Sequence, residues 1–450
     1  MTHDPSPKVY SFEGEAPGRL DVMGGIADYS GSLLLQMPIR YRTHVTVRGR
    51  SDGLLHIRTY QSTVKFKDCV FPVQELAGKS YDEIRTWGDS IPESDWASYV
   101  YGCLAVLHKE KQVPLKGLEL VIQSAVPEGK GVSSSAALEV ATLKALSRFY
   151  GLDLNRTKLP LLAQMAENLI VGAPCGLMDQ LSTYLGRKGM LLPIRCQPHE
   201  VFDPIKIPRG MYFDAIDSGI RHAVSGASYT DVRISAFMGY GLIARQEGLS
   251  AQLMEKARSE RSQVKLPYDG YLSNIPLAEF NSNYRGRIPE KMTGEAFLGS
   301  CGNTIDAVTS VDPYKTYEPL ACTIHPVEEN HRIRIFRTIL ETWDRQADRS
   351  AALRELGGLM IASHRSYSAV GLGNENTDAL VSLAQEYGPE NGVYGARVSG
   401  GGSGGTVVFL CYGASGRAAV RSIASRYRKA YGIKAKYFQG SSEGACFSHP

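Results

Sequence analysis

The sequence has no strong excess of charge of one sign and no long apolar run. It carries 50 basic and 46 acidic side chains among 450 residues, a formal net charge of +4. This balance gives no argument for a surface that binds nucleic acid or membrane lipids. No run approaches the roughly 18 apolar residues of a membrane-spanning helix. We therefore expect a protein with neither a nucleic-acid partner nor a membrane partner.

Cysteine motifs typical of zinc sites or redox sites are also missing. The eight cysteines form no CxxC pair, and none stands at zinc-finger spacing from a histidine. In the reducing cytoplasm thiols stay free, because glutathione and thioredoxin remove disulfides there. The sequence thus predicts a cytoplasmic protein with free, mostly buried thiols.

Length and pattern predict two domains of the α+β class. A chain of 450 residues exceeds one ordinary hydrophobic core. Predicted strands and helices are mixed without strict alternation, which favours α+β layers. The least regular boundary lies near 197–208, so we divide the chain into domains 1–205 and 206–450. Residues 260–330, rich in Pro, Tyr and Asn, are expected to form loops and short helices.

A Gly/Ser-rich loop, Pro127–Ala137, stands between a predicted strand at 118–126 and a predicted helix that Gly151 ends. Glycines let backbone N–H groups approach an anion, serines add hydroxyl donors, and the helix directs its positive end there. The loop therefore predicts a phosphate cradle, with a flexible turn as the alternative. It is not a Walker loop, because no lysine precedes a Ser or Thr.

A second glycine loop follows Arg397 in the sequence RVSGGGSGG. It lies between two apolar segments and holds more glycine than a hairpin turn needs. We expect its backbone to pack against the first cradle, and a simple flexible hairpin is the alternative.

Two acidic residues are candidates for chemistry near the segment Gly172–Gln180. Asp179 follows a Pro/Gly turn, where a carboxylate can accept or orient a hydroxyl proton. A helix N-cap is its alternative role. Glu167 lies on the preceding predicted helix and is a candidate Mg²⁺ ligand, because Mg²⁺ takes hard oxygen donors and shares substrate phosphates. A solvated carboxylate on the helix face is the alternative for Glu167.

A fourth segment, APGRLDVMGGIADYSG at 16–31, precedes apolar residues 33–47 that are predicted to form strands. Arg19 is a candidate for stabilising a transferring phosphate or for holding Asp179 ionised. Asp28 is a candidate acceptor of hydrogen bonds from sugar hydroxyls. Turn chemistry is the alternative for both residues.

These four segments, in this order, resemble the GHMP kinase superfamily and its galactokinase branch. Two linking segments, DWASYVYG at 95–102 and DSGIRHAVSGASY at 217–229, are also galactokinase-like. The sequence is further similar to the kinase region of L-arabinokinases. The resemblance implies a two-domain fold: an N-terminal domain like domain 2 of ribosomal protein S5, a C-terminal ferredoxin-like α/β domain, and an active site in the cleft between them. It also implies ATP, Mg²⁺ and a sugar 1-phosphate product.

The resemblance assigns roles to particular residues. It implies Asp179 as catalytic base with Arg19 beside it, and Ser135 and Glu167 as Mg²⁺ ligands. Sugar contacts are expected from Arg19, Gly25, Ile26, Asp28, Gly176, Asp179 and Tyr229. ATP contacts are expected from Gly129, Gly131, Ser133, Ser134, Ser135 and Ala136, and near the adenine from Trp96 and Tyr99. For Trp96 and Tyr99, burial in the core is the alternative.

One departure from the galactokinase pattern bears on the sugar. Galactokinases read GEHTDY where this chain has Gly24-Gly25-Ile26-Ala27-Asp28-Tyr29. In galactokinases the replaced Glu and His serve the hydroxymethyl end of galactose. L-Arabinopyranose has the ring stereochemistry of D-galactose without C6, so a site with no polar group there suits it. We therefore expect an L-arabinose 1-kinase, as a monomer or weak homodimer.

Two alternatives stay open at this point. The chain could phosphorylate galactose or another C6 variant such as a uronic acid, for which Arg40 and Arg42 are the nearest cations in the sequence. A galactokinase-like sensor that binds sugar and ATP without turnover is the other alternative.

Overall fold

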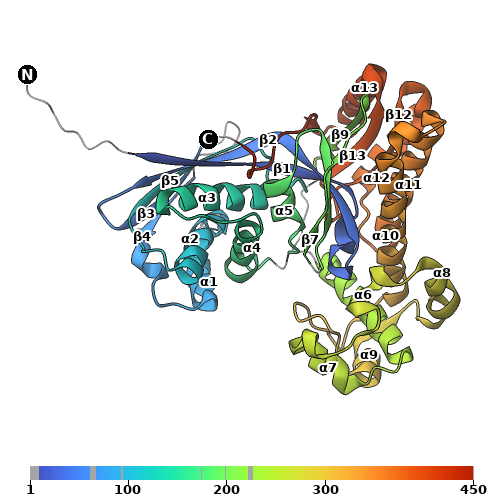
Figure 1. The fold of residues 1–450 in the computed structure, drawn as a ribbon, viewed down its shortest axis with the longest axis horizontal. Helices are drawn as coiled ribbons and strands as arrows, with labels where there is room; N and C mark the ends of the chain where they lie inside the picture. Colours follow the sequence, from blue (N-terminus) through green and yellow to red (C-terminus); the bar gives the residue numbers. More distant parts are fainter. Residues whose placement is uncertain are drawn as a thin grey trace, which may run out of the picture.

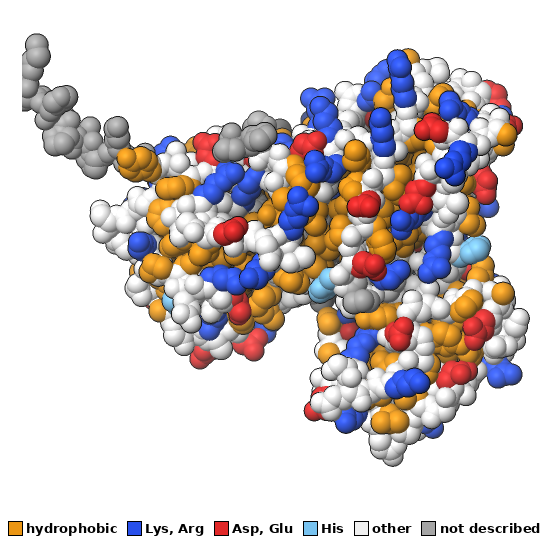
Figure 2. Space-filling view, in the orientation of Figure 1, with side chains coloured by type: hydrophobic (Ala, Val, Ile, Leu, Met, Phe, Trp, Pro, Cys, Tyr) orange, Lys and Arg blue, Asp and Glu red, His pale blue; other side chains and the backbone are white. Residues whose placement is uncertain are grey.

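The computed structural model describes residues 10–60, 67–92, 95–173, 175–197, 199–220 and 227–448. Two β-sheets with their helices form one elongated body, and a helical lobe projects from it (Figure 1). Basic and acidic side chains are interspersed on the face shown in Figure 2, as the balanced composition predicts. Across these described ranges, no helix is long and apolar enough to cross a membrane.

The first sheet gathers strands from the N-terminal half of the chain. Its order is β4-β3-β5-β2-β6-β7, with β1 paired to β2 and β8 paired to β6. The predicted strand character of 33–47 is confirmed within one long strand whose buried valines enter the core, and that of 118–126 is confirmed for 118–124. The strands are β1 Ser11–Met23, β2 Leu33–Gly49, β3 Leu54–Tyr60, β4 Lys67–Pro72, β5 Leu118–Ser124, β6 Met190–Arg195, β7 Glu200–Val201 and β8 Ile205–Lys206.

Five helices lie along one face of this sheet (Figure 1). They are α1 Tyr81–Asp89, α2 Ser98–Lys111, α3 Ser134–Tyr150, α4 Lys158–Met165 and α5 Met178–Leu185. Helix α3 ends at Gly151, whose φ of 66° and backbone N–H bonds to two preceding carbonyls close the last turn. The predicted strand–loop–helix order around the Gly/Ser loop is thereby confirmed.

The second sheet is antiparallel, with the order β12-β13-β9-β14. Its strands are β9 Met211–Asp217, β12 Val393–Val398, β13 Thr406–Tyr412 and β14 Tyr437–Phe438. The helices α10 Pro319–Glu341, α11 Arg349–Ala369, α12 Glu375–Tyr387 and α13 Gly413–Tyr431 stand beside it (Figure 1). The two sheets with their helices make the mixed α+β, two-domain architecture that the sequence predicted.

The projecting lobe is helical and contains the segment 260–330. It holds α6 Ala227–Gln246, α7 Ala251–Ser259, α8 Leu277–Glu279 and α9 Gly294–Cys301, with a two-stranded pair of β10 Met292–Thr293 and β11 Thr316–Tyr317. Short helical turns fill the rest, at Arg261–Gln263, Pro267–Gly270, Leu272–Asn274, Phe280–Tyr284 and Arg285–Arg287. The expectation of loops and short helices is confirmed for 260–318, whereas it is wrong for 319–330, which form the first half of the long helix α10. The apolar core of the lobe includes Ile26 and Tyr29, so the lobe packs on the segment 16–31.

The chain passes from the first sheet to the second between Lys206 and Met211. After β14 it returns to the first domain. Ser441 forms an isolated bridge with Ile39 of β2, and Ala445 is buried in the core of the first domain. Lys144 of α3 donates hydrogen bonds to the carbonyls of Ala445 and Ser448. The division at 205/206 stays a prediction, and this packing leads us to propose that residues 439–448 be grouped with the first domain.

Candidate active site

The Gly/Ser loop reaches α3 through three residues with left-handed backbone. Gly129, Gly131 and Ser133 have φ of 67°, 68° and 56°, and the helix begins at Ser134. A non-glycine residue in this region is strained, and such strain gathers at functional sites. The buried Ser133 hydroxyl has no hydrogen-bond partner among the described residues. An unpaired hydroxyl beside helix N–H groups fits a phosphate, which supplies the missing acceptor.

The Gly/Ser loop is held by contacts from distant parts of the chain. Arg19 donates from its backbone N–H to the Val132 carbonyl at 3.0 Å and from Nη1 to the Gly131 carbonyl at 2.7 Å. The Thr406 hydroxyl donates to the Lys130 carbonyl at 2.7 Å, and Lys130 Nζ lies 3.2 Å from Asp217 Oδ2. Residues from both sheets therefore hold the Gly/Ser loop in place.

The second glycine loop packs on the first, as the sequence predicted. A Cβ at Gly131 would lie 3.2 Å from the Ser399 carbonyl oxygen, so the two backbones are almost in contact there. The Ser399 hydroxyl accepts from the backbone N–H of Asp21, and Arg397 forms a fully buried ion pair with the Asp21 carboxylate at 2.8 Å. This pair gives Asp21 a structural partner and fixes the start of the loop.

Arg19 on β1 meets Asp179 at the start of α5. Arg19 Nε and Nη2 lie 2.9 and 2.8 Å from Asp179 Oδ1. Both distances join the same carboxylate oxygen, so Oδ2 is not used by the arginine. Arg19 is buried, which strengthens its field at the carboxylate because little water screens it. This pair leaves the second carboxylate oxygen of Asp179 available to a hydroxyl.

Glu167 lies in the π-helical turn Ala166–Val171 that follows α4, close to Ser135 and Asp179. Burial first, and then the charge of Asp179, raises the pKa of Glu167, whereas hydrogen bonds from Cys175 and Ser135 lower it. Gln180 donates to Glu167 Oε2 at 2.6 Å. A cation between the two carboxylates would relieve their repulsion. Hydroxyl and carboxylate oxygens are the donors that Mg²⁺ prefers, so this set fits the metal.

Asp28 forms part of the short helix Gly25–Ser30 and is buried. Burial is the main cause that raises the pKa of Asp28 to about 6, with Arg233 opposing it. Its Oδ1 accepts from the backbone N–H of Tyr29 at 2.7 Å. A Cβ at Gly176 would lie 2.2 Å from Asp28 Oδ2, so the carboxylate keeps its position only because residue 176 is glycine.

One cavity of about 360 Å³ brings most of the predicted site residues together. It is lined by Arg19, Gly25, Ile26, Asp28, Gly129, Gly131, Ser133, Ser134, Ser135, Glu167, Gly176, Asp179 and Tyr229, with Gly400 and Gly401 from the second loop. Ala136, predicted as an ATP contact, is fully buried and does not line this cavity. Tyr99 lines this cavity as well.

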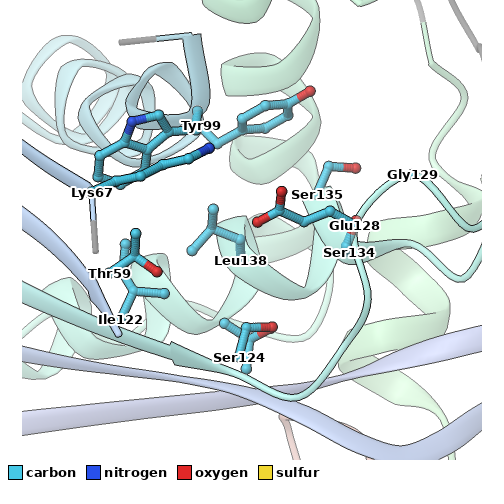
Figure 3. Close-up of a pocket in the computed structure, with 12 residues that line it drawn as sticks. Thr59, Lys67, Tyr99, Ile122, Ser124, Glu128, Gly129, Ser134, Ser135 and Leu138 are labelled. Carbon is cyan, nitrogen blue, oxygen red and sulfur yellow. The ribbon is translucent and has the colours of Figure 1, made fainter. Parts of the chain in front are cut away.

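A neighbouring cavity of about 220 Å³ is lined in part by Trp96. Ser134, Ser135 and Leu138 border it from α3, opposite Lys67, and Tyr99 stands over them (Figure 3). The two cavities share Tyr99, Gly129, Ser134 and Ser135. An elongated ligand with a flat apolar end and an anionic end therefore fits across both.

Sequence reasoning missed residues that line these cavities or interact with residues that line them. Glu139, four residues after Ser135 on α3, is fully buried, and Gln180 reaches its carboxylate at 3.2 Å. Lys67 lines the second cavity, 5.8 Å from the Trp96 ring. The helical spacing from Ser135 could have identified Glu139, since residues at i and i+4 share one face. No sequence signal connects Lys67 to the site.

Two parts of the predicted motifs fall on residues that the structure does not describe. These are Pro174 and residues 221–226 of the galactokinase-like segment 217–229. Tyr229 is described, and its ring lies edge to face with Tyr29 at 6.4 Å between centroids.

Comparison with known proteins agrees with this arrangement. The GHMP kinases N terminal domain matches residues 98–187, and the GHMP kinases C terminal domain matches 349–431. An L-arabinokinase from Arabidopsis thaliana is 38% identical over 96% of this chain, which spans 46% of that protein's length. A galactokinase from Chloroflexus aggregans is 29% identical over 88% of this chain and 82% of its own.

Solved structures show the same fold. The structure of Lactococcus lactis galactokinase complexed with galactose has a TM-score of 0.70 at 21% identity, covering 97% of this chain and 94% of that one. A mevalonate kinase has a TM-score of 0.56 at 14% identity, covering 96% and 99%. With both domains matched and the fold shared over its length, the chain has the two-domain fold of the GHMP kinases.

Proposed function

We propose that the protein transfers the γ-phosphate of ATP to the anomeric hydroxyl of L-arabinose. The observation that carries the proposal is that Gly25 and Ile26 line the main cavity at the two positions where galactokinases carry Glu and His. The relative named L-arabinokinase matches nearly the whole length of this chain and supports the same substrate.

ATP fits across the two cavities in one direction. Trp96, Tyr99 and Leu138 offer aromatic and apolar surface for the adenine, while the Gly/Ser loop offers N–H groups and hydroxyls for the phosphates. Ser135 and Glu167 would hold Mg²⁺, which when bound neutralises phosphate charge. Glu167 lies close to both the loop and Asp179, so the phosphate and sugar sides of the site are adjacent.

The transfer needs no covalent intermediate with the protein. The anomeric oxygen forms a bond to the γ-phosphorus, the bond from that phosphorus to the β–γ bridging oxygen breaks, and ADP leaves with the electron pair. Asp179 accepts or orients the hydroxyl proton through the oxygen that Arg19 leaves unused. Arg19 also bonds Gly131, so one side chain sets the distance between base and phosphate loop.

The choice of sugar follows from which polar or charged groups on the sugar find a partner in the cavity wall. The hydroxymethyl hydroxyl of galactose would face Ile26 without a polar partner, and such a burial costs about 1–3 kcal/mol. A uronate would need a cation. Arg42 instead bonds Ser442 and the Glu443 carbonyl outside the cavity, and Arg40 is exposed. These contacts favour a sugar without a substituent at C5.

The test is a transfer assay with purified protein, ATP, Mg²⁺, and L-arabinose, D-galactose or D-galacturonate. We expect L-arabinose 1-phosphate to form with the highest kcat/KM. Good turnover of galactose with no product from L-arabinose would show that the substrate is wrong. Binding of both ligands without turnover would indicate a sensor.

A variant tests the catalytic pair. Asp179→Ala should lower kcat by about 100- to 10,000-fold, since that is the range for a general base. Near-normal turnover would remove Asp179 from the reaction.

A further inference from the structure

A tyrosine outside the four site segments joins two walls of the sugar cavity. Tyr367, on α11, is completely buried. Its hydroxyl accepts from the backbone N–H of Ile26 at 2.9 Å and donates to the Gly400 carbonyl at 2.8 Å. Ile26 and Gly400 both line the cavity, whereas Tyr367 stands behind them. One hydroxyl thus sets the spacing between the segment 16–31, hereafter the sugar segment, and the second glycine loop.

The same hydroxyl requires residue 25 to be glycine. A Cβ built at Gly25 would lie 1.5 Å from Tyr367 Oη and 2.8 Å from its Cζ. No real Cβ tolerates such distances, and a φ of 47° at Gly25 adds backbone strain for any other residue. The tyrosine hydroxyl therefore occupies the space through which a side chain at position 25 would leave the backbone.

The ring of Tyr367 is fixed by its neighbours. The His325 ring lies edge to face with it at 5.2 Å, and the Arg397 guanidinium lies 5.2 Å from its centroid. Arg397 is itself held by the buried Asp21. Because these contacts involve the ring and not the hydroxyl, removal of the hydroxyl alone should leave the ring in place.

We propose that Tyr367 is a positioning residue that sets the sugar selectivity. Its hydroxyl excludes any side chain from position 25 and holds the backbone of Ile26, so that neither position presents a polar side chain to the sugar. The cavity then favours a pentopyranose over a hexopyranose with an exocyclic hydroxymethyl group. This inference rests on the proposed function, because it takes this cavity to be the sugar site.

The first test compares Tyr367→Phe with Tyr240→Phe. Tyr240 is equally buried and donates one hydrogen bond to the Pro267 carbonyl at 2.9 Å, but it lies in the helical lobe away from the cavity. In Tyr367→Phe two buried backbone groups lose their partner. We expect the KM for L-arabinose to rise about tenfold, the preference over galactose to fall about fivefold or more, and kcat to change little. Tyr240→Phe should change neither KM nor the preference.

The second test is a double-mutant cycle. Gly25→Ala alone should raise the sugar KM strongly, because its Cβ displaces the tyrosine hydroxyl. In a Tyr367→Leu background, which lacks Cζ and Oη, the same change should cost much less. Thermal unfolding of each variant shows whether it is folded before its kinetics are compared.

The outcomes separate the two proposals. Wild-type protein that phosphorylates galactose but not L-arabinose refutes the proposed function. Wild-type protein that prefers L-arabinose, with folded Tyr367→Phe retaining the same KM and preference, refutes the role of Tyr367. An equal cost of Gly25→Ala in both backgrounds refutes the steric coupling.

Discussion

The buried carboxylate of Asp28 should lower stability at neutral pH in exchange for sugar binding. Desolvation raises the pKa of Asp28 from 3.8 to about 6 in the folded chain. Between these values the folded state binds more proton than the unfolded state, so stability falls as the pH rises through this window. Above pH 6 the folded protein bears the full cost of a buried charge.

The size of this effect follows from the pKa difference. A shift from 3.8 to about 6 corresponds to about 3 kcal/mol. Asp28→Asn removes the charge, and its side-chain oxygen can still accept from the Tyr29 N–H. We therefore expect the variant to be up to about 3 kcal/mol more stable than the wild type above pH 6, with the difference vanishing near pH 4. For a chain of 450 residues this is roughly 3 °C in Tm.

The assay is thermal or urea unfolding of both proteins from pH 4 to pH 8, without sugar or ATP. The same variant should bind sugar less well, with the KM raised about 10- to 100-fold through loss of a charged acceptor. A variant that is less stable than the wild type at pH 8 would refute the reasoning. So would a stability difference that does not depend on pH.

Three further changes test other contacts of the site. Gly176→Ala places a Cβ 2.2 Å from Asp28 Oδ2, so the sugar KM should rise about tenfold while the ATP KM stays constant; an equal rise in both would contradict this. Lys130→Met removes the pair with Asp217, and should lower Tm and raise the ATP KM, leaving sugar affinity unchanged in calorimetry. Trp96→Ala should raise the ATP KM about fivefold by removing aromatic surface; unchanged nucleotide binding would place Trp96 outside the ATP site.

Local features of the site could be predicted from the sequence because they depend on neighbouring residues. The strand before Pro127, the glycines and serines after it, and the helix up to Gly151 are each encoded within a few residues. The meeting of Arg19 with Asp179, 160 residues apart, is different. No local pattern requires it: the residue types made it one candidate role of Arg19, and the resemblance to a known family placed Arg19 beside Asp179.

Contacts that depend on tertiary structure could not be predicted. Tyr367 occurs in an ordinary helical sequence, and its reach to Ile26 exists only because α11 crosses behind the sugar segment. The substitution at Gly25 was visible in the sequence, but its steric reason lies in Tyr367. The segment 439–448 has no apolar periodicity that would indicate which sheet it joins.

The return of residues 439–448 to the first sheet has a consequence for synthesis of the chain. They leave the ribosome only after the whole second domain has been made. Until then Lys144 has no carbonyl of Ala445 or Ser448 to bond, and the core of the first domain lacks Ala445. The contacts of helix α3 are therefore completed late, so the first domain cannot reach its final packing before the second domain has been synthesised. Acquisition of nucleotide binding should then follow synthesis of residues 439–448 and not synthesis of the first sheet alone.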